Sequence, residues 1–107
     1  MKIIENRFIP TKRYVAINIF GFLFCRDKSK INDLVINHEK IHTYQQYELM
    51  FIFFYIWYGI ELLINLFKYK NFIRAYYNIS FELEAYYHDK DMEYLQNRKL
   101  FAFTKYL

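Results

Sequence analysis

Hydrophobic and polar positions divide this chain into a β-rich beginning, a long apolar middle and a more polar end. Residues 2–9 and 14–24 are rich in β-branched and aromatic side chains, the residue types that favour strands. Residues 10–13, which begin with the only proline, can connect them, so we expect a short N-terminal β-hairpin or pair of strands. Cys25 ends the second apolar run, which is typical of a buried strand with a packed thiol.

The first predicted helix covers residues 33–48. Asn32 and Asp33 can cap its start, just before the apolar residues 34–36. Polar side chains of high helix propensity then continue to Glu48, which supports a helix over the whole range.

A very hydrophobic segment, residues 49–67, follows and is about the length of a transmembrane helix. Glu61 and Asn65 lie on one face of that helix, and an ionisable group inside a bilayer is costly unless it faces protein, water or a metal. Two interpretations remain open: a central helix buried by the rest of the domain, or a membrane-embedded helix that brings a site to the bilayer surface. A helix that is apolar on all sides is hard to bury in a small domain, which favours the membrane.

The C-terminal part, residues 71–107, predicts further helices. Residues 71–78 and 81–98 fit two helical pieces broken near residues 78–80. The whole pattern predicts a predominantly helical α+β fold in one domain over residues 1–107. Its parts are a β-rich region over residues 1–30, two helices over residues 33–67 and the C-terminal helices over residues 71–107.

Composition and charge narrow the partners and the location. The 107 residues include 12 Phe and 12 Tyr, which implies a bulky interior or a membrane-facing surface. The net charge is +4, but the basic residues are spread along the chain, so we expect no nucleic-acid partner and regard anionic lipid headgroups as an alternative. Residues 1–9 include acidic Glu5 and lack a long apolar core, so they predict no signal peptide. We therefore expect a membrane-associated or cytoplasmic protein.

The candidate chemistry lies in the first predicted helix, where His38-Glu39-Lys40-Ile41-His42 forms an HExxH motif. Residues four apart share one helix face, so both imidazoles can reach the same metal ion. Zinc lowers the pKa of a water from about 15.7 to about 7, and Glu39 can take the proton as that water attacks a carbonyl. The motif predicts zinc bound by His38 and His42, with Glu39 as the general base.

Catalytic zinc needs a third protein ligand, which the sequence places beyond the hydrophobic segment. Residues 80–86 hold two carboxylates, Glu82 and Glu84, near a helix start that Ser80 can cap. The two cannot both face one metal, since a step of two residues turns a helix by about 200°. His88 is a third candidate, because histidine is the commonest metal ligand.

These motifs together resemble small zincin-like proteins of Bacteroidetes with a gluzincin-type HExxH site. The resemblance covers about residues 33–107 and includes the motif, residues 45–49, the aromatic run over 54–58 and residues 80–86. More remotely, the segment from Phe81 to Ala85 is similar to the FExxAD element of CAAX-prenyl-protease and HtpX-like membrane zinc proteases. There the first glutamate is the third zinc ligand, which implies Glu82 here. Tyr86 stands where those proteases carry an aspartate of the outer shell that steadies the site.

The sequence thus predicts a zinc-dependent metallohydrolase, most simply a peptidase, with His38, His42 and Glu82 as metal ligands and Glu39 as the catalytic base. Its substrate would be a peptide or protein, which an edge strand of the N-terminal sheet can align by main-chain hydrogen bonds. One alternative is a catalytically inactive metal-binding or membrane-associated interaction protein that keeps the zincin frame. Another is a purely structural helical membrane protein, which predicts no stoichiometric metal.

Overall fold

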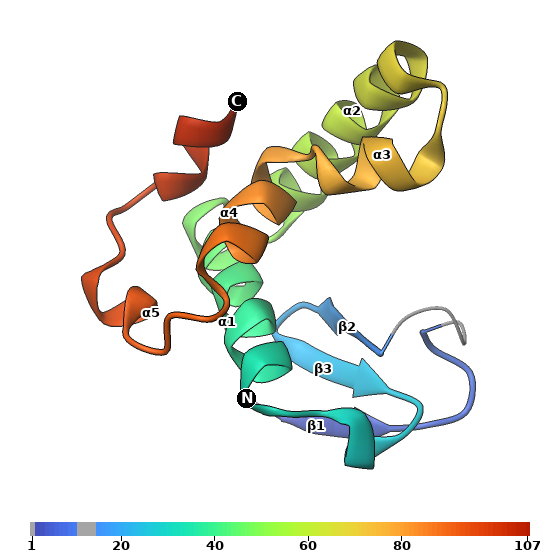
Figure 1. Cartoon of the computed structure of the whole chain (residues 1–107), viewed down its shortest axis with the longest axis vertical. Helices are drawn as coiled ribbons and strands as arrows, with labels where there is room; N and C mark the ends of the chain where they lie inside the picture. Colours follow the sequence, from blue (N-terminus) through green and yellow to red (C-terminus); the bar gives the residue numbers. More distant parts are fainter. Residues whose placement is uncertain (1, 11–14) are drawn as a thin grey trace.

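The computed structural model describes residues 2–10 and 15–107 and confirms a predominantly helical α+β fold (Figure 1). A small sheet comes first and the helices follow. The strands are β1 (Ile3–Glu5), β2 (Ala16–Ile19) and β3 (Phe22–Cys25). The α-helices are α1 (Asp33–Glu48), α2 (Ile52–Tyr69), α3 (Phe72–Tyr77), α4 (Ser80–His88) and α5 (Tyr94–Asn97), with short 3-10 helices at Lys28–Lys30 and Ala102–Tyr106.

The hairpin in the N-terminal part is built from different segments than the sequence pattern predicts. The sheet order is β1-β3-β2; β3 pairs antiparallel with β2 and parallel with β1. The expected second strand, residues 14–24, is therefore two strands joined by a two-residue loop. Phe20 and Gly21 form that loop with φ of 51° and 88°, the positive values that tight hairpin turns require. Of the predicted connection, residues 11–13 lie outside the described residues.

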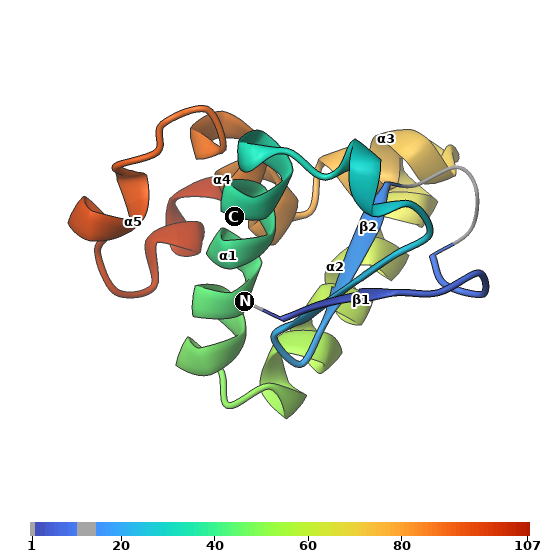
Figure 2. The same cartoon turned by 90° about the horizontal axis from the view of Figure 1, so that it is seen from below.

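The helix α1 has the predicted bounds. The Asn32 side chain accepts a hydrogen bond from the backbone N–H of Val35, as an N-cap should. Viewed from below, the sheet and the segment containing α4 and α5 lie on opposite sides of α1 (Figure 2). The motif-bearing helix is thus held from both sides.

The apolar helix α2 begins three residues later than predicted. Met50 and Phe51 have φ of 52° and 61°, so the chain reverses there instead of continuing as a helix. Among the described residues, α2 is the one helix long and apolar enough to cross a membrane by length and composition. Its inner side packs on protein: Phe54 lies 4.6 Å from Phe81 and Trp57 lies 5.2 Å from Phe103, both measured between ring centroids.

The two polar residues inside α2 tie it to the C-terminal helices. Glu61 accepts hydrogen bonds from the backbone N–H and the hydroxyl of Ser80, so it caps the start of α4. Asn65 donates to the carbonyl of Ala75 in α3. Both side chains therefore face protein, as the cost of a bilayer-exposed carboxylate requires.

The predicted helix over 71–78 is confirmed as α3, but the one over 81–98 ends early, at His88. The Asn37 amide of α1 donates to the backbone carbonyls of Asp89 and Asp91, at 2.8 and 3.0 Å. The Asn37 side chain thus supplies the hydrogen bonds that these carbonyls would otherwise need from a continuing helix. The helix ends there, and the following segment packs on α1.

A buried ionic network fixes α4 against the end of α1. Arg98 donates two hydrogen bonds to the carboxylate of Glu48, at 2.8 and 3.0 Å, and binds the fully buried Glu84 as well. Burial alone would raise the pKa of Glu84, but hydrogen bonds from Arg98, Tyr94 and Gln45 lower it below its usual value. Glu84 therefore stays ionised and pairs with Arg98.

Replacing Arg98 tests this network. Arg98→Ala leaves the Glu84 charge buried without its partner, so we expect a loss of about 3–5 kcal/mol in the free energy of unfolding, measured by urea denaturation. Lys99→Ala, a change in the exposed neighbour, should cost no more than about 0.5 kcal/mol. The pKa of Glu84 is lowered in the folded protein, so the ion pair stabilises the fold above the usual pKa of a carboxyl group. This stabilisation is lost as the pH falls and Glu84 takes up a proton. The difference in stability between the wild type and Arg98→Ala should therefore shrink in acid. Equal stability of the two variants near neutral pH would contradict this role.

Candidate metal centre

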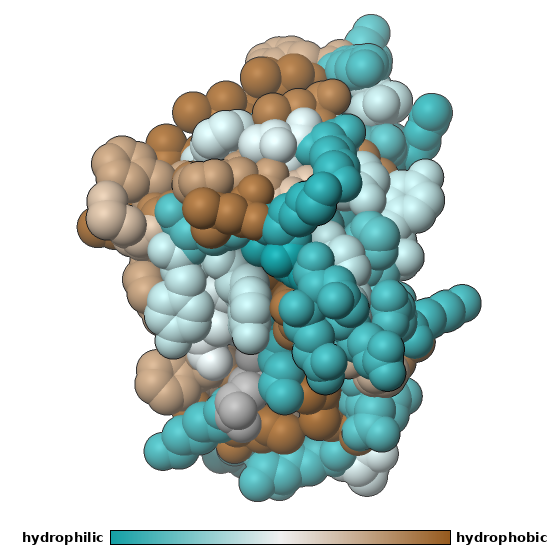
Figure 3. Space-filling model, turned by 90° about the vertical axis from the view of Figure 1, so that its left-hand side faces the viewer, coloured by the Kyte–Doolittle hydropathy of each residue, from teal (hydrophilic) through white to brown (hydrophobic). Residues whose placement is uncertain are grey.

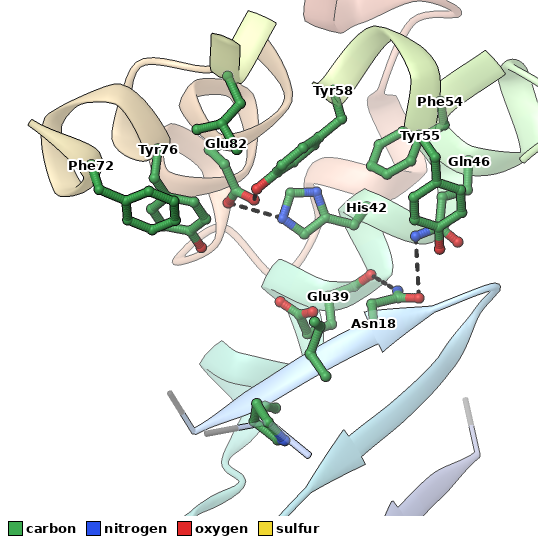
Figure 4. Close-up of a pocket in the computed structure, with 14 residues that line it drawn as sticks. Asn18, Glu39, His42, Gln46, Phe54, Tyr55, Tyr58, Phe72, Tyr76 and Glu82 are labelled. Atoms are coloured by element: carbon green, nitrogen blue, oxygen red, sulfur yellow. Dashed lines mark hydrogen bonds and ion pairs between the residues drawn. The ribbon is translucent and has the colours of Figure 1, made fainter. Parts of the chain in front are cut away.

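The two motif histidines and Glu82 converge between α1 and α4. His38 and His42 lie one turn apart on α1, and their buried rings have centroids 4.9 Å apart. Glu82 Oε1 lies 3.4 Å from His38 Nε2 and 3.1 Å from His42 Nε2 (Figure 4 shows His42 and Glu82). Ligands bound tetrahedrally at 2.0–2.2 Å from zinc are about 3.3 Å apart, so Glu82 Oε1 lies at a suitable spacing from each imidazole nitrogen.

A second carboxylate, that of Glu39, lies at the edge of this cluster. Its Oε2 is 3.8 Å from His38 Nε2, and ligand atoms of Glu39 and the two histidines all lie within 4.8 Å of one another. Both Glu39 and Glu82 are thus within reach of a metal. Glu82 Oε1 lies closer to His38 Nε2 than Glu39 Oε2 does, at 3.4 against 3.8 Å, which favours Glu82 as the third candidate ligand and leaves Glu39 beside it.

Hydrogen bonds fix both imidazoles with the Nε2 atom toward the site. The carboxylate of Asp89 lies 3.0 Å from His38 Nδ1 and can only accept, so Nδ1 carries the proton. His42 Nδ1 lies 2.8 Å from the amide oxygen of Gln45, whose nitrogen donates to the Phe81 carbonyl and to Glu84. In the neutral form of each ring, Nδ1 would carry the proton and Nε2 would offer its lone pair to a metal, the tautomer that such second partners normally impose.

Asp89 is the site residue that sequence reasoning missed. The resemblance places an outer-shell aspartate at position 86, where this chain has a tyrosine whose ring packs 4.3 Å from the His38 ring. Asp89 follows Glu82 by seven residues, nearly two turns of a helix, so it returns to the same side of α4. The sequence signal that could have identified Asp89 is an acidic residue seven positions after Glu82.

The charges of the site are strongly coupled. Burial alone would lower the pKa of His42, but the neighbouring Glu82 carboxylate raises it to about 10. Burial alone would raise the pKa of Glu82, yet the attraction of His42 and the hydrogen bonds from both histidines hold it well below its usual value. A positive charge is therefore favoured between these side chains, which is the electrostatic requirement for a cation site.

Glu39 has the opposite tendency. Burial raises its pKa above the usual range, and the two histidines offset only part of that effect. A carboxylate with a raised pKa is a better proton acceptor at neutral pH, as a general base should be.

A pocket of about 300 Å³ opens beside the metal cluster and is lined mainly by apolar side chains (Figure 4). Glu39, His42 and Glu82 form its polar side. The other lining residues are Pro10, which follows β1, and residues of β2, α1, α2 and α3: Ala16, Ile17, Asn18, Gln46, Phe54, Tyr55, Tyr58, Leu62, Phe72 and Tyr76. The candidate chemistry thus faces a space that can hold a ligand.

Two pocket residues also position the cluster. The Tyr58 hydroxyl donates to Glu82 Oε2 at 2.8 Å, and burial together with that carboxylate raises the pKa of Tyr58, so the donor keeps its proton. Asn18 of β2 donates to the backbone carbonyl of Glu39 at 2.8 Å. Helix α2 therefore orients Glu82, and the edge of the sheet is joined to the motif.

The structure does not bring the rival candidates to the cluster. Glu84 is held by Arg98 and Gln45, as described above. His88 stacks on Tyr94 with ring centroids 3.9 Å apart, and its Nε2 bonds the Tyr106 hydroxyl. Glu61, for which protein, water or a metal were the possible surroundings, faces protein and caps α4.

Comparison with known proteins adds no further identification: no family model, no curated protein and no solved structure matches this chain. The resemblance to zincin-like proteins stays a prediction from the sequence. The candidate site is therefore judged on its own geometry.

Replacing Asp89 tests whether it supports a metal ligand. In Asp89→Ala the His38 imidazole loses the carboxylate that fixes its tautomer, so we expect zinc affinity to fall about 10–100-fold in a chelator competition assay. Asp91→Ala is the matched control, because the Asp91 carboxylate is exposed and only accepts a hydrogen bond from the backbone of Glu93. An equal change of affinity in both variants would contradict the assignment.

Proposed function

We propose that this protein is a zinc-dependent hydrolase whose substrate is a peptide bond. The observation that carries the proposal is the convergence of two oriented imidazoles on the Glu82 carboxylate, whose Oε1 lies 3.4 and 3.1 Å from their Nε2 atoms. Glu39, with its raised pKa, lies directly beside them on the wall of a pocket. A ligand set, a base and a space for substrate are the parts that metal-assisted hydrolysis needs.

Each residue of the site has a separate role in the proposed reaction. Zinc held by His38, His42 and Glu82 would supply an activated water and polarise the scissile carbonyl. Glu39 takes the proton of the attacking water and returns it to the leaving amine, which balances the reaction. Tyr58 keeps Glu82 in place through its hydroxyl, and Asp89 does the same for His38.

A peptide fits this site better than a compact amide. Strand β2 is an edge of the sheet, and its residues Ala16, Ile17 and Asn18 line the pocket. An edge strand offers unpaired N–H and C=O groups along one side, to which an extended peptide can add as a further strand. The strand lies beside Glu39, to which Asn18 is hydrogen-bonded, so a peptide on it would pass the base.

The location that this proposal favours is a membrane surface. Helix α2 is apolar and long enough to cross a bilayer, and of its 18 residues Phe54 alone is buried. A helix of that composition fits a membrane-associated protein better than a cytoplasmic one, because a core helix would be mostly covered.

Replacing Glu39, the proposed base, distinguishes a hydrolase from a protein that only binds metal. Glu39→Gln removes the proton acceptor and leaves both imidazoles and Glu82, so we expect hydrolysis of a quenched fluorogenic peptide library to fall about 10²–10⁴-fold while bound zinc is retained. Glu93→Gln, a change of an exposed glutamate on the same chain, should leave the rate unchanged.

The other outcome supports the alternative function. If the wild-type protein binds zinc but cleaves no member of the library, and Glu39→Gln changes nothing measurable, the protein is a metal-binding interaction protein with a zincin frame. If the wild type holds no stoichiometric zinc, a structural membrane protein is the remaining interpretation.

A further inference from the structure

Helix α2 presents to solvent a face that consists of apolar side chains. We call it the α2 apolar face; its members are between 53% and 82% exposed and are Ile52, Phe53, Ile56, Ile60, Leu63, Ile64 and Phe67. They recur at intervals of three, four and seven residues, so they lie along one side of the helix. Soluble monomers rarely leave an apolar surface of this extent uncovered, so the face requires a partner.

The α2 apolar face is distinguished by continuity along one helix. Figure 3 shows the left-hand side of Figure 1, where hydrophobic side chains appear near the top and hydrophilic ones cover much of the rest. Exposed apolar residues also occur outside α2, such as Phe8 and Leu100, but the seven of the α2 apolar face share one side of a single helix.

The opposite side of α2 is occupied by protein. Phe54 is buried against Phe81, and Glu61 and Asn65 are bonded to the backbone of α4 and α3. Helix α3 runs beside α2. If α2 crossed a bilayer, Glu61, Asn65 and the helices bonded to them would enter the hydrocarbon with it, and polar groups there are costly. One face of α2 can contact lipid, but the whole helix cannot be surrounded by it.

Cations and an aromatic ring lie together at the C-terminal end of the apolar face. Lys68 Nζ and the Arg74 guanidinium lie 5.2 and 5.0 Å from the centroid of the Tyr69 ring, and exposed Lys70 follows directly. Tyrosine rings and basic side chains are the groups that anchor proteins at the level of lipid headgroups. Each basic residue near an anionic surface contributes attraction that salt weakens.

We propose that α2 docks this protein on an anionic lipid bilayer by lying in the plane of the interface. The α2 apolar face enters the boundary of the acyl chains, and Lys68, Lys70 and Arg74 meet lipid phosphates. This mode is that of an interfacial amphipathic helix, buried to about 5–10 Å. The inference rests on the proposed membrane location but not on the proposed hydrolysis.

A second copy of the chain is the less suitable occupant. Protein interfaces normally carry about one hydrogen bond per 100–200 Å², whereas no residue of the α2 apolar face has a hydrogen-bonding side chain. A symmetric dimer with parallel α2 helices would also bring the same cations of both copies close together, and like charges repel. Lipid needs no hydrogen bond from the face and supplies the opposite charge.

Vesicle sedimentation tests the docking. The full chain should sediment with vesicles of phosphatidylcholine and phosphatidylglycerol, and less with phosphatidylcholine alone or at high salt. Ile60→Asp combined with Phe67→Asp should weaken this binding by roughly tenfold or more, because it places two charges where acyl chains would lie. Phe8→Asp is the matched control, since Phe8 is 76% exposed but lies in the N-terminal part, near the sheet. Circular dichroism checks that all three proteins are folded.

Spin-label depth separates lying in the interface from crossing it. Single cysteines at positions 53, 60 and 67 are two turns apart on one side of α2, and buried Cys25 is replaced by alanine. A helix in the interface plane gives similar depths at all three positions. A helix that crosses the bilayer places position 60 about 10 Å deeper than the other two, from a rise of 1.5 Å per residue.

The outcomes are distinct. Anionic-lipid binding that the double variant loses, with even depths, supports the inference. Binding with a deep position 60 keeps the membrane location but overturns in-plane docking. No vesicle binding overturns the location itself, and a dimer in solution that the double variant dissociates identifies a second copy as the occupant.

Discussion

The contact between α1 and α4 is the constraint on which the rest of the structure depends. The inner side of α1 carries buried polar groups, and burying such groups is costly unless each finds a partner. Asn37 bonds to the backbone of Asp89, and His38 bonds to the Asp89 carboxylate, directly after α4. Gln45 bonds to Glu84 on α4. These hydrogen bonds offset the cost of burying the polar groups, and they also hold Glu82 next to the two imidazoles. Stability and the geometry of the candidate site have the same physical origin.

Helix α2 joins this site to the surface of the molecule. Its inner side caps α4 through Glu61 and orients Glu82 through Tyr58, while its outer side is apolar and uncovered. Removing α2 from its place would thus disturb both the start of the helix that carries the third candidate ligand and that ligand itself. In the proposed account, the element that contacts lipid also orients the third candidate ligand.

The sequence predicted the parts whose signals are local. The cap at Asn32 and the HExxH spacing located α1 and its histidines, because helix geometry alone puts residues four apart on one face. The sheet was wrong in detail because parallel pairing of β1 with β3 is a long-range choice and the turn at Gly21 lies inside one apolar run. The end of α4 depends on Asn37, about fifty residues earlier in the chain, so no local pattern signals it. Asp89 was missed because its partner His38 lies about fifty residues away, and only its spacing of seven from Glu82 could have signalled it. Choosing Glu82 over Glu84 needed a resemblance because both are near the helix start.

The most direct test of the account is zinc K-edge X-ray absorption on the purified full chain, with metal content measured on the same sample. The account predicts about one zinc per chain, with scattering from two imidazoles and oxygen ligands at about 2.0–2.2 Å. In Glu82→Gln the oxygen shell should change while both imidazoles remain. A chain without stoichiometric metal, or a spectrum with a different number of imidazoles, would contradict the claim that His38, His42 and Glu82 form a zinc site.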